Sequence, residues 1–220
     1  ITALGYPDEK SNDFLRWWPA DLHMVGKDIL RFHAVYWPAF LMGAGLNVPK
    51  RVFAHGWWTN EGLKISKSIG NIIDPNKIVE KYGLDQVRYF LLREVPFGND
   101  GDFSHRAIVN RINSDLANDL GNLSQRVLSM VNRNCDGKVP NFIESDIEKS
   151  PVYHTLCQAH DLLKKQRIHI DQQKFHDALD EIWKVVRDSN RTIDDAAPWN
   201  LKKTDPDAMA NVLYMFLEII

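Results

Sequence analysis

The sequence predicts an α/β layer followed by an all-α part that forms an antiparallel helix bundle. Up to Pro96, short apolar runs alternate with helical segments, an alternation typical of parallel strands joined by helices. Residues 96–102 are rich in turn formers, and beyond them only the helical spacing of apolar residues persists. We therefore expect two domains, 1–97 and 98–220.

Two strands are expected in the first part. The apolar run 22–25 stops at Gly26 and predicts a buried strand. Residues 51–59 predict the second strand, with a tight turn at Glu61-Gly62 after it. Between the strands, 28–43 predicts a helix with one apolar face. The members of that face are Ile29, Phe32, His33, Tyr36 and Phe40.

Proline, glycine and aspartate set the expected helix ends. Pro38 should bend or break the helix in which it stands. Asp74-Pro75 predicts an N-cap with proline at the first helical position, and Gly83 closes that helix. Asp85 is expected to cap the next helix, which runs to about Glu94.

The second part is expected to hold four helices. The first carries a long apolar stripe, formed by Ile108, Ile112, Leu116, Leu120, Leu123, Val127 and Met130. A polar loop at 134–150 follows, and further helices are expected at 151–168, 172–191 and 207–220. Pro198 breaks the chain before the last of them.

Composition and charge limit the possible functions. Of the 220 residues, 44% are hydrophobic and 25% charged, and the net charge is −2, as in an ordinary globular protein. Lys and Arg outnumber Asp and Glu by 12 to 10 up to Pro96, but beyond it they are outnumbered 19 to 15. A nucleic acid must therefore be held through a local patch and specific contacts, because bulk charge does not attract it.

The ends of the chain and its cysteines indicate its setting. The first residues lack the basic start and apolar stretch of a signal peptide, and no apolar run approaches the ~20 residues of a membrane helix. Cys135 and Cys157 have neither zinc-ligand nor disulfide spacing, so we expect no metal site and a cytoplasmic protein. The chain starts without Met and its last residues predict an unfinished apolar helix, so we expect a piece of a longer polypeptide.

The first chemical motif is the lysine loop, Lys64-Ile65-Ser66-Lys67-Ser68. Two lysines three residues apart can place ammonium groups on a polyphosphate, and the serine hydroxyls add donors. Gly62 and Gly70 let the loop move. Catalysis at phosphate depends mostly on positioning and charge stabilisation, which suits such a loop. The alternative is a solvated hairpin tip with ordinary lysines.

The second motif runs from Gly26 to His33. Gly26 permits close approach of a ligand just past a strand end, where α/β sheets bind their ligands. Asp28 can cap the following helix or accept hydrogen bonds from a ribose or an amine. Ile29 and His33 lie one helical turn apart and face the same way. The alternative for His33 is a packed core residue.

The third motif lies in the helical part. Asn118, Asn122 and Arg126 recur every four residues and share one helix face. Amide and guanidinium groups can hydrogen-bond unstacked bases, and Trp199 after Pro198 offers a stacking platform. The alternatives are a solvated helix flank and a packed tryptophan.

These motifs together resemble the methionyl-tRNA synthetases, a family of class I aminoacyl-tRNA synthetases. The lysine loop and its flanks, 55–63 and 69–71, resemble the second class I signature, whose usual form has Met where Ile65 stands. The order Gly-Lys-Asp-Ile-x-x-Phe-His at 26–33 is the form found in the methionine enzymes. The resemblance covers essentially the whole chain and is closest to the bacterial type at 50–121.

The resemblance implies a role for each motif. It makes Lys67 the principal catalytic residue, with Lys64 as its helper. Ile29 and His33 are implied to line the methionine side-chain pocket. The positions implied to bind ATP are Ser66, Ser68, Gly26, Asp28, His55, Gly56 and Trp58. The positions implied to recognise the CAU anticodon are Asn118, Asn122, Arg126, Pro198 and Trp199.

The implied fold is the C-terminal part of a Rossmann-like catalytic domain followed by a helical anticodon-binding domain. The implied reaction ligates L-methionine to initiator and elongator methionine tRNA through methionyl-adenylate, with ATP and Mg²⁺ as substrate. The first class I signature, of His-Ile-Gly-His type, is absent, so the chain alone should be inactive.

Three other functions stay open. The protein can be a synthetase for cysteine, leucine, isoleucine or valine, although the residues between Gly26 and His33 disfavour this. It can be a tRNA-binding protein without catalytic activity. It can also be a generic phosphate-binding α/β domain, although it lacks a glycine-rich phosphate loop.

Overall fold

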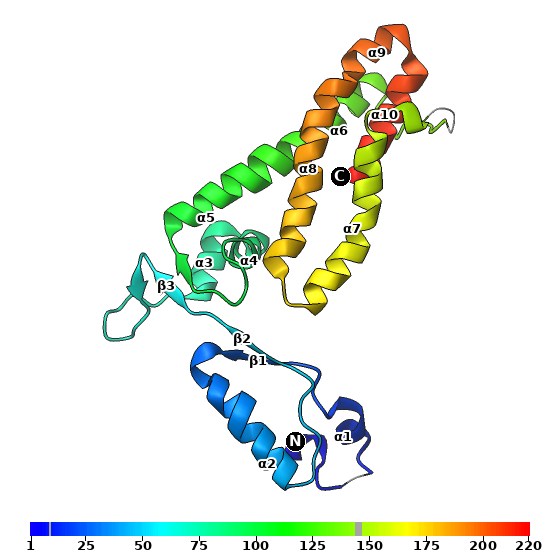
Figure 1. Ribbon diagram of the computed structural model, residues 1–220. Coiled ribbons are helices and arrows are strands. Elements are labelled where there is room, and N and C mark those ends of the chain that lie inside the picture. Colours follow the sequence, from blue (N-terminus) through cyan, green and yellow to red (C-terminus); the bar gives the residue numbers. More distant parts are fainter. Residues whose placement is uncertain (9, 144–146) are drawn as a thin grey trace. The chain divides into compact units, whose positions relative to one another are not determined.

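The computed structural model describes residues 1–8, 10–143 and 147–220, and the chain forms two compact units (Figure 1). Unit 1 comprises Ile1–Ile72 and Phe97–Phe103, and unit 2 comprises Ile73–Pro96 and Ser104–Ile220. This structural division differs from the predicted boundary after residue 97, which concerns functional domains and stays a prediction.

Unit 1 contains two small sheets. Strands β1 (His23–Gly26) and β2 (Val52–His55) pair in parallel. In the other sheet, β3 (Trp58–Asn60) lies between β4 (Leu63–Lys64), its antiparallel neighbour, and β5 (Gly101–Phe103), its parallel neighbour.

The prediction of one strand at 51–59 is wrong in one respect. The chain leaves the first sheet after His55 and enters the second at Trp58. The cause is a close backbone approach, because a Cβ on Gly56 would lie 2.1 Å from the carbonyl oxygen of Asn99. The turn-forming run at 96–102 also contributes a strand, since β5 begins within it.

The helical segments of unit 1 are short. They are η1 (Thr2–Leu4), α1 (Asn12–Trp17), and a helical run from Lys27 that consists of η2 (Lys27–Ile29), the π-helical turn η3 (Phe32–Tyr36) and α2 (Trp37–Gly43). Pro38 stands in the first turn of α2, directly after the π-helical turn, so the predicted irregularity occurs beside it.

The prediction of a buried strand at 22–25 is wrong for most of that strand. The apolar face of the predicted helix 28–43 is also largely exposed, with Phe32 57% and Phe40 69% accessible. In β1 only Val25 is buried, and Met24 is 47% exposed. A sheet of two strands gives each strand little cover, so hydrophobic periodicity marked the secondary structure but not the burial.

The helix ends at the start of unit 2 are largely as predicted. Helix α3 (Pro75–Tyr82) begins after Asp74, whose carboxylate accepts a hydrogen bond of 2.9 Å from the Asn76 N–H. Gly83 ends it with φ 92°. Helix α4 (Leu84–Arg93) follows, but Asp85 lies in its first turn and Gly83 occupies the N-cap position.

The predicted long helix is continuous, but its middle segment is a π-helix, which is wider than an α-helix. It comprises α5 (His105–Arg111), the π-helical η4 (Ile112–Gly121) and α6 (Asn122–Asn134). Ile108, Leu123 and Val127 of the predicted stripe are fully buried, whereas its members within η4 are half-buried. The π-helical turns rotate the side chains away from the period of 3.6, and Asp115 is buried there instead.

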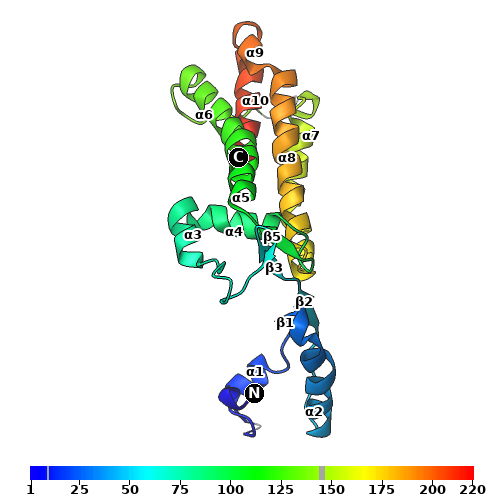
Figure 2. The same ribbon diagram turned by 90° about the vertical axis from the view of Figure 1, so that its left-hand side faces the viewer.

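The remaining helices pack together. Figures 1 and 2 show α7 (Tyr153–Asp171) and α8 (Phe175–Ala196) side by side, and α10 (Pro206–Ile219) packs on α6 and α7. These three confirm the predicted helices with ends shifted by a few residues. The prediction missed α9 (Pro198–Thr204), because Pro198 starts this helix instead of only breaking the chain. Of the predicted loop at 134–150, residues 144–146 lie outside the described residues, and η5 (Ile147–Lys149) forms a short turn.

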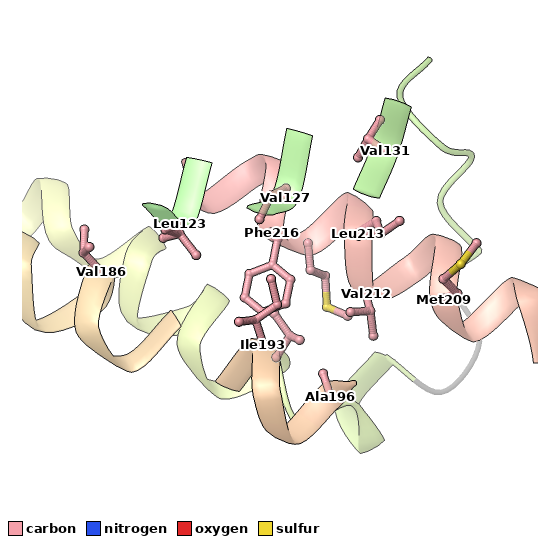
Figure 3. Close-up of a cluster of buried hydrophobic side chains, with 12 residues drawn as sticks. Leu123, Val127, Val131, Val186, Ile193, Ala196, Met209, Val212, Leu213 and Phe216 are labelled. Atoms are coloured by element: carbon pink, nitrogen blue, oxygen red, sulfur yellow. The ribbon is translucent and has the colours of Figure 1, made fainter. Parts of the chain in front are cut away.

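The main hydrophobic core lies among α6, α8 and α10 (Figure 3). Phe216 and Leu213 of α10 are fully buried, and Val127 from α6 and Ile193 from α8 gather around them. Packing of these side chains, and not helix propensity, is the main source of stability for the helices.

Within unit 2, a network of charged and polar groups links α4 to η4 and to α8. Asp115 is 8% exposed and accepts hydrogen bonds from the Tyr89 hydroxyl (2.6 Å) and Arg111 (3.2 Å). Arg93 is 9% exposed and donates to Asp180 of α8 at 2.6 Å. Burial alone raises the pKa of Asp115, but hydrogen bonds and the charge of Arg111 outweigh it, so the pKa lies below its ordinary value.

Across the described ranges, the helices are too short or too polar for any of them to cross a membrane.

Replacing Leu213 by alanine should destabilise the protein by about 2–5 kcal/mol, because the side chain is fully buried and its loss leaves a cavity. Leu163→Ala is the matched control, since Leu163 is 61% exposed on α7 and should cost less than about 0.5 kcal/mol. Urea unfolding followed by circular dichroism measures both. Equal losses in the two variants would contradict the assignment of the core.

Candidate functional site

The lysine loop extends from a β-hairpin. Glu61 (φ 52°) and Gly62 (φ 77°) form the two-residue turn between β3 and β4, as predicted. Lys64 ends β4, opposite Thr59 of β3. The chain then turns back on itself, since the Gly70 N–H donates to the Ser66 carbonyl at 3.1 Å.

The lysine loop carries two serine hydroxyls and two exposed lysines. The Ser66 and Ser68 hydroxyl oxygens lie 2.7 Å apart, and the Ser68 N–H donates to the Ser66 hydroxyl at 3.3 Å. Lys64 and Lys67 are exposed, and within the described chain neither forms an ion pair. Both lysines are therefore available to an anionic ligand.

Asp102 of β5 holds the hairpin turn. Its Oδ1 accepts hydrogen bonds from the Gly62 N–H at 2.7 Å and from the Thr59 hydroxyl. The bond from Thr59, and then that from Gly62, lowers the pKa of Asp102 below its ordinary value. The carboxylate is therefore charged at neutral pH, and these bonds are lost only as the pH falls through that lowered pKa.

Three residues predicted to bind a nucleotide come together at the ends of β1 and β2. Gly26 pairs with His55 in the parallel register. A Cβ on Gly26 would lie 2.4 Å from the Asp28 carboxylate and 3.9 Å from the His55 ring. A larger residue at 26 would push the Asp28 carboxylate aside, and the carboxyl ends of parallel strands are the usual place for a ligand in α/β proteins.

A neighbouring cluster was missed by the sequence analysis. Lys27 forms an ion pair of 2.6 Å with Asp100, and its ammonium lies 4.5 Å from the centre of the Trp57 ring. Asp100 also accepts a hydrogen bond of 2.9 Å from the Trp57 N–H. These bonds, first from Lys27 and then from Trp57, lower the pKa of Asp100. The acidic residues of 96–102 were the available signal, but this run was predicted as a turn-rich domain boundary.

The two residues predicted for the methionine pocket are adjacent in space. The Nδ1 of His33 lies 3.0 Å from the Ile29 carbonyl oxygen, one turn away. The ring of His23 lies 6.0 Å from that of His33, at nearly a right angle. Burial, and then the charge of His33, lowers the pKa of His23. Ile29 is 38% exposed and free to contact a ligand.

In unit 2, the structure brings Asn118, Asn122 and Arg126 together in one groove of about 630 Å³. The opposite wall is α8. Asn122 approaches Asn190 at 3.5 Å, and Arg126 forms an ion pair with Asp194. The spacing of four residues therefore placed the three side chains correctly even though Asn118 lies in the π-helical η4.

The wall on α8 was not foreseen. Helix α8 contributes Lys184, Arg187, Asp188, Asn190, Arg191 and Asp194 to the lining. The helix predicted at 172–191 carried no predicted binding residue. Basic residues of α8 recur every three to four positions (184, 187, 191), and that spacing was the available signal for a cationic face.

Pro198 and Trp199 lie at the start of α9, directly after α8. Ala197 adopts a left-handed conformation with φ 39°, which turns the chain between the two helices. Pro198 is buried and Trp199 is 47% exposed. The lining of the groove, as far as the chain is described, does not include Trp199. Its exposed ring can therefore stack on a ligand at the end of α8.

Comparisons with known proteins identify relatives of the whole chain. The family model described as class I tRNA synthetases (M) matches residues 1–128. The methionine–tRNA ligases of Brucella suis and Rickettsia felis are 57% and 53% identical over 100% of this chain. The chain spans about 42–43% of their length.

Solved structures agree with these relatives. The Mycobacterium tuberculosis methionyl-tRNA synthetase in complex with methionyl-adenylate matches 99% of this chain and 43% of its own, with a TM-score of 0.90 and 53% identity. Its apo form matches with a TM-score of 0.87 and 50% identity. Our chain thus has the fold of the corresponding part of these synthetases.

Asp102→Ala should weaken the hairpin turn, because the Gly62 N–H and the Thr59 hydroxyl lose their acceptor. We expect hydrogen exchange of the Gly62 amide at pH 6 to accelerate on the order of tenfold, the factor that one hydrogen bond to a charged group supports. Asp13→Ala, a change on the exposed side of α1, is the control. Unchanged Gly62 protection in the Asp102 variant would refute the role of this carboxylate.

Proposed function

The chain belongs to the class I tRNA synthetases of the methionine family, and we propose that it serves ATP-dependent ligation of L-methionine to methionine tRNA. The observation that carries the proposal is the lysine loop, which follows the β3–β4 hairpin. It holds two exposed lysines that form no ion pair within the described chain, together with two serine hydroxyls 2.7 Å apart. Because the chain spans only part of its relatives, the reaction belongs to the full-length protein.

The proposed reaction has two steps. The methionine carboxylate attacks the α-phosphate of ATP, which forms methionyl-adenylate and releases pyrophosphate. A terminal hydroxyl of the tRNA then attacks the methionyl carbonyl, which forms the ester and releases AMP. Lys67, assisted by Lys64, stabilises the negative charge that develops on the phosphates during the first step. The Ser66 and Ser68 hydroxyls donate further hydrogen bonds, and ATP is used with Mg²⁺ as substrate.

The ends of β1 and β2 are proposed to hold the substrates. Gly26 allows the nucleotide to approach the backbone, and Asp28 and His55 offer polar groups beside it. Gly56 and Trp58 complete the proposed ATP-binding set. Ile29 and His33, adjacent through the 3.0 Å contact, are proposed to bind the methionine side chain. A slot of this kind separates methionine from other apolar side chains only to a limited extent.

The groove of unit 2 is proposed to recognise the anticodon of initiator and elongator methionine tRNA. Asn118, Asn122 and Arg126 present amide and guanidinium groups from one wall. Trp199, half exposed after the buried Pro198, is proposed to stack on an unpaired base.

We further propose that 1–97 is the C-terminal part of a Rossmann-like catalytic domain and that 98–220 is an antiparallel helical anticodon-binding domain. The parallel pair β1–β2 and the packed helices α7, α8 and α10 support this division. The free thiols of Cys135 and Cys157 support a cytoplasmic setting.

Lys67→Ala in the full-length enzyme should lower kcat of methionine-dependent ATP–pyrophosphate exchange by about 10²–10³-fold, the usual cost of one charge-stabilising group. Lys77→Ala, which removes an exposed lysine of α3, is the control and should leave the rate unchanged. Near-normal exchange by the Lys67 variant would exclude it as a catalytic residue. An unmodified enzyme without exchange activity would point to a tRNA-binding protein.

Trp199→Ala should raise KM for tRNA in aminoacylation by about 10–100-fold, because stacking contributes about 1–3 kcal/mol per base. Pyrophosphate exchange should stay nearly normal, since that step needs no anticodon. Trp17→Ala, at a tryptophan 56% exposed on α1, tests for a general effect of removing a surface indole. Equal loss of exchange and aminoacylation in the Trp199 variant would contradict a role in anticodon recognition.

A further inference from the structure

Backbone pairing stops where the lysine loop begins. Strand β4 pairs with β3 only at Leu63 and Lys64. Beyond this point, the Lys64 carbonyl and the Ser66 N–H find their partner in a side chain, that of Asn71. The first half of the lysine loop, from Lys64 to Ser66, is therefore held by the side-chain carboxamide of Asn71.

The hydrogen bonds of Asn71 imitate a neighbouring strand. Its Nδ2 donates to the Lys64 carbonyl at 3.1 Å, and its Oδ1 accepts from the Ser66 N–H at 2.9 Å. In a parallel pair of strands, one residue of the neighbouring strand makes the same two bonds, because its N–H donates to the carbonyl before a given position and its C=O accepts from the N–H after it. Asn71 thus keeps the segment around Ile65 extended, with Lys64 and Ser66 at fixed separation.

Asn71 is itself anchored to the sheet. Its carbonyl oxygen accepts a hydrogen bond of 2.8 Å from the side chain of Asn60, which lies in the central strand β3. The turn between Ser66 and Gly70 connects the two ends of the clamp. The sequence from Lys64 to Asn71 is therefore a closed loop. Its closing side-chain bonds come from Asn71, whereas Lys67 contributes only its backbone carbonyl, which accepts from the Gly70 N–H at 3.2 Å, and its exposed side chain stays available.

We propose that Asn71 is a positioning residue for the reaction. Its two hydrogen bonds to the loop backbone set the direction of Lys67 relative to Lys64. The proposal rests on the proposed function of the lysine loop. Asn71 itself contacts no reacting atom. Its loss should slow the chemical step, because a misdirected ammonium group stabilises less charge in the transition state.

The first test is Asn71→Ala in the full-length enzyme, measured by ATP–pyrophosphate exchange. We expect kcat to fall about 10–100-fold while KM for methionine stays within about twofold, since the methionine side chain is bound elsewhere. Asn71→Asp keeps the acceptor for the Ser66 N–H but loses the donor to the Lys64 carbonyl, so its kcat should lie between those of the unmodified enzyme and the alanine variant. Asn76→Ala, at an exposed asparagine in the first turn of α3, should be unchanged. Full activity of either Asn71 variant would overturn the proposal.

The second test is a double-mutant cycle with Lys67→Ala. If Asn71 acts through Lys67, then Asn71→Ala should change kcat by less than about threefold in the Lys67→Ala background. If the decreases in kcat of the two single variants multiply in the double variant, Asn71 acts independently of Lys67, and the proposal is overturned.

Limited trypsin digestion separates this proposal from the proposed function. Cleavage after Lys64 and Lys67 should be several-fold faster in Asn71→Ala than in the unmodified enzyme or Asn76→Ala, because the loop loses its clamp. Equal cleavage rates would refute the clamp whether or not the enzyme is active. An unmodified enzyme that shows no exchange, with faster cleavage of the variant, would refute the proposed function and leave the clamp supported.

Discussion

The close approach of the backbone at Gly56 to the carbonyl of Asn99 is the constraint on which unit 1 depends. Only a residue without a side chain allows it, since a Cβ would lie 2.1 Å from that oxygen. The approach ends β2, starts β3 and brings β5 alongside as a parallel neighbour. Two aspartates of the returning segment then stabilise the site, Asp100 through Lys27 and Asp102 through the hairpin turn.

The lysine loop illustrates how an exposed loop can be ordered without a large core. Its lysines are exposed, and its order comes from hydrogen bonds that three polar side chains make with backbone groups. Asp102 holds the turn, Asn60 anchors the return, and Asn71 spans the gap between them. Such bonds are individually weak in water, so the loop can still respond to a nucleotide.

Unit 2 combines a groove lined by polar side chains with helices that a hydrophobic core holds in place. The apolar contacts of Phe216 and Leu213 and the buried charges of Arg93 and Asp115 fix the helices. The groove then forms between η4–α6 and α8, with Arg126 held by Asp194. An anionic ligand in this groove would compete with Asp194 for the Arg126 guanidinium. The ion pair therefore favours binding through specific hydrogen bonds over attraction by bulk charge.

The sequence by itself determined what depends on residues close together in the chain. The hairpin turn at Glu61-Gly62, the cap at Asp74 and the shared face of Ile29 and His33 follow from backbone sterics and local periodicity. The motif order also determined the family, which the comparisons confirm. These features need no distant partner, so a single sequence is sufficient to predict them.

Only the tertiary structure decided the rest. The break at Gly56, the strand at 101–103 and the α8 wall of the groove each depend on a partner far along the chain. Burial of the strand at 22–25 was predicted wrongly for the same reason, since Met24 is 47% exposed. The period of the apolar residues did not indicate the π-helical η4. Periodicity tells which side chains share a face, whereas what covers that face is set by long-range packing, and no local pattern encodes it.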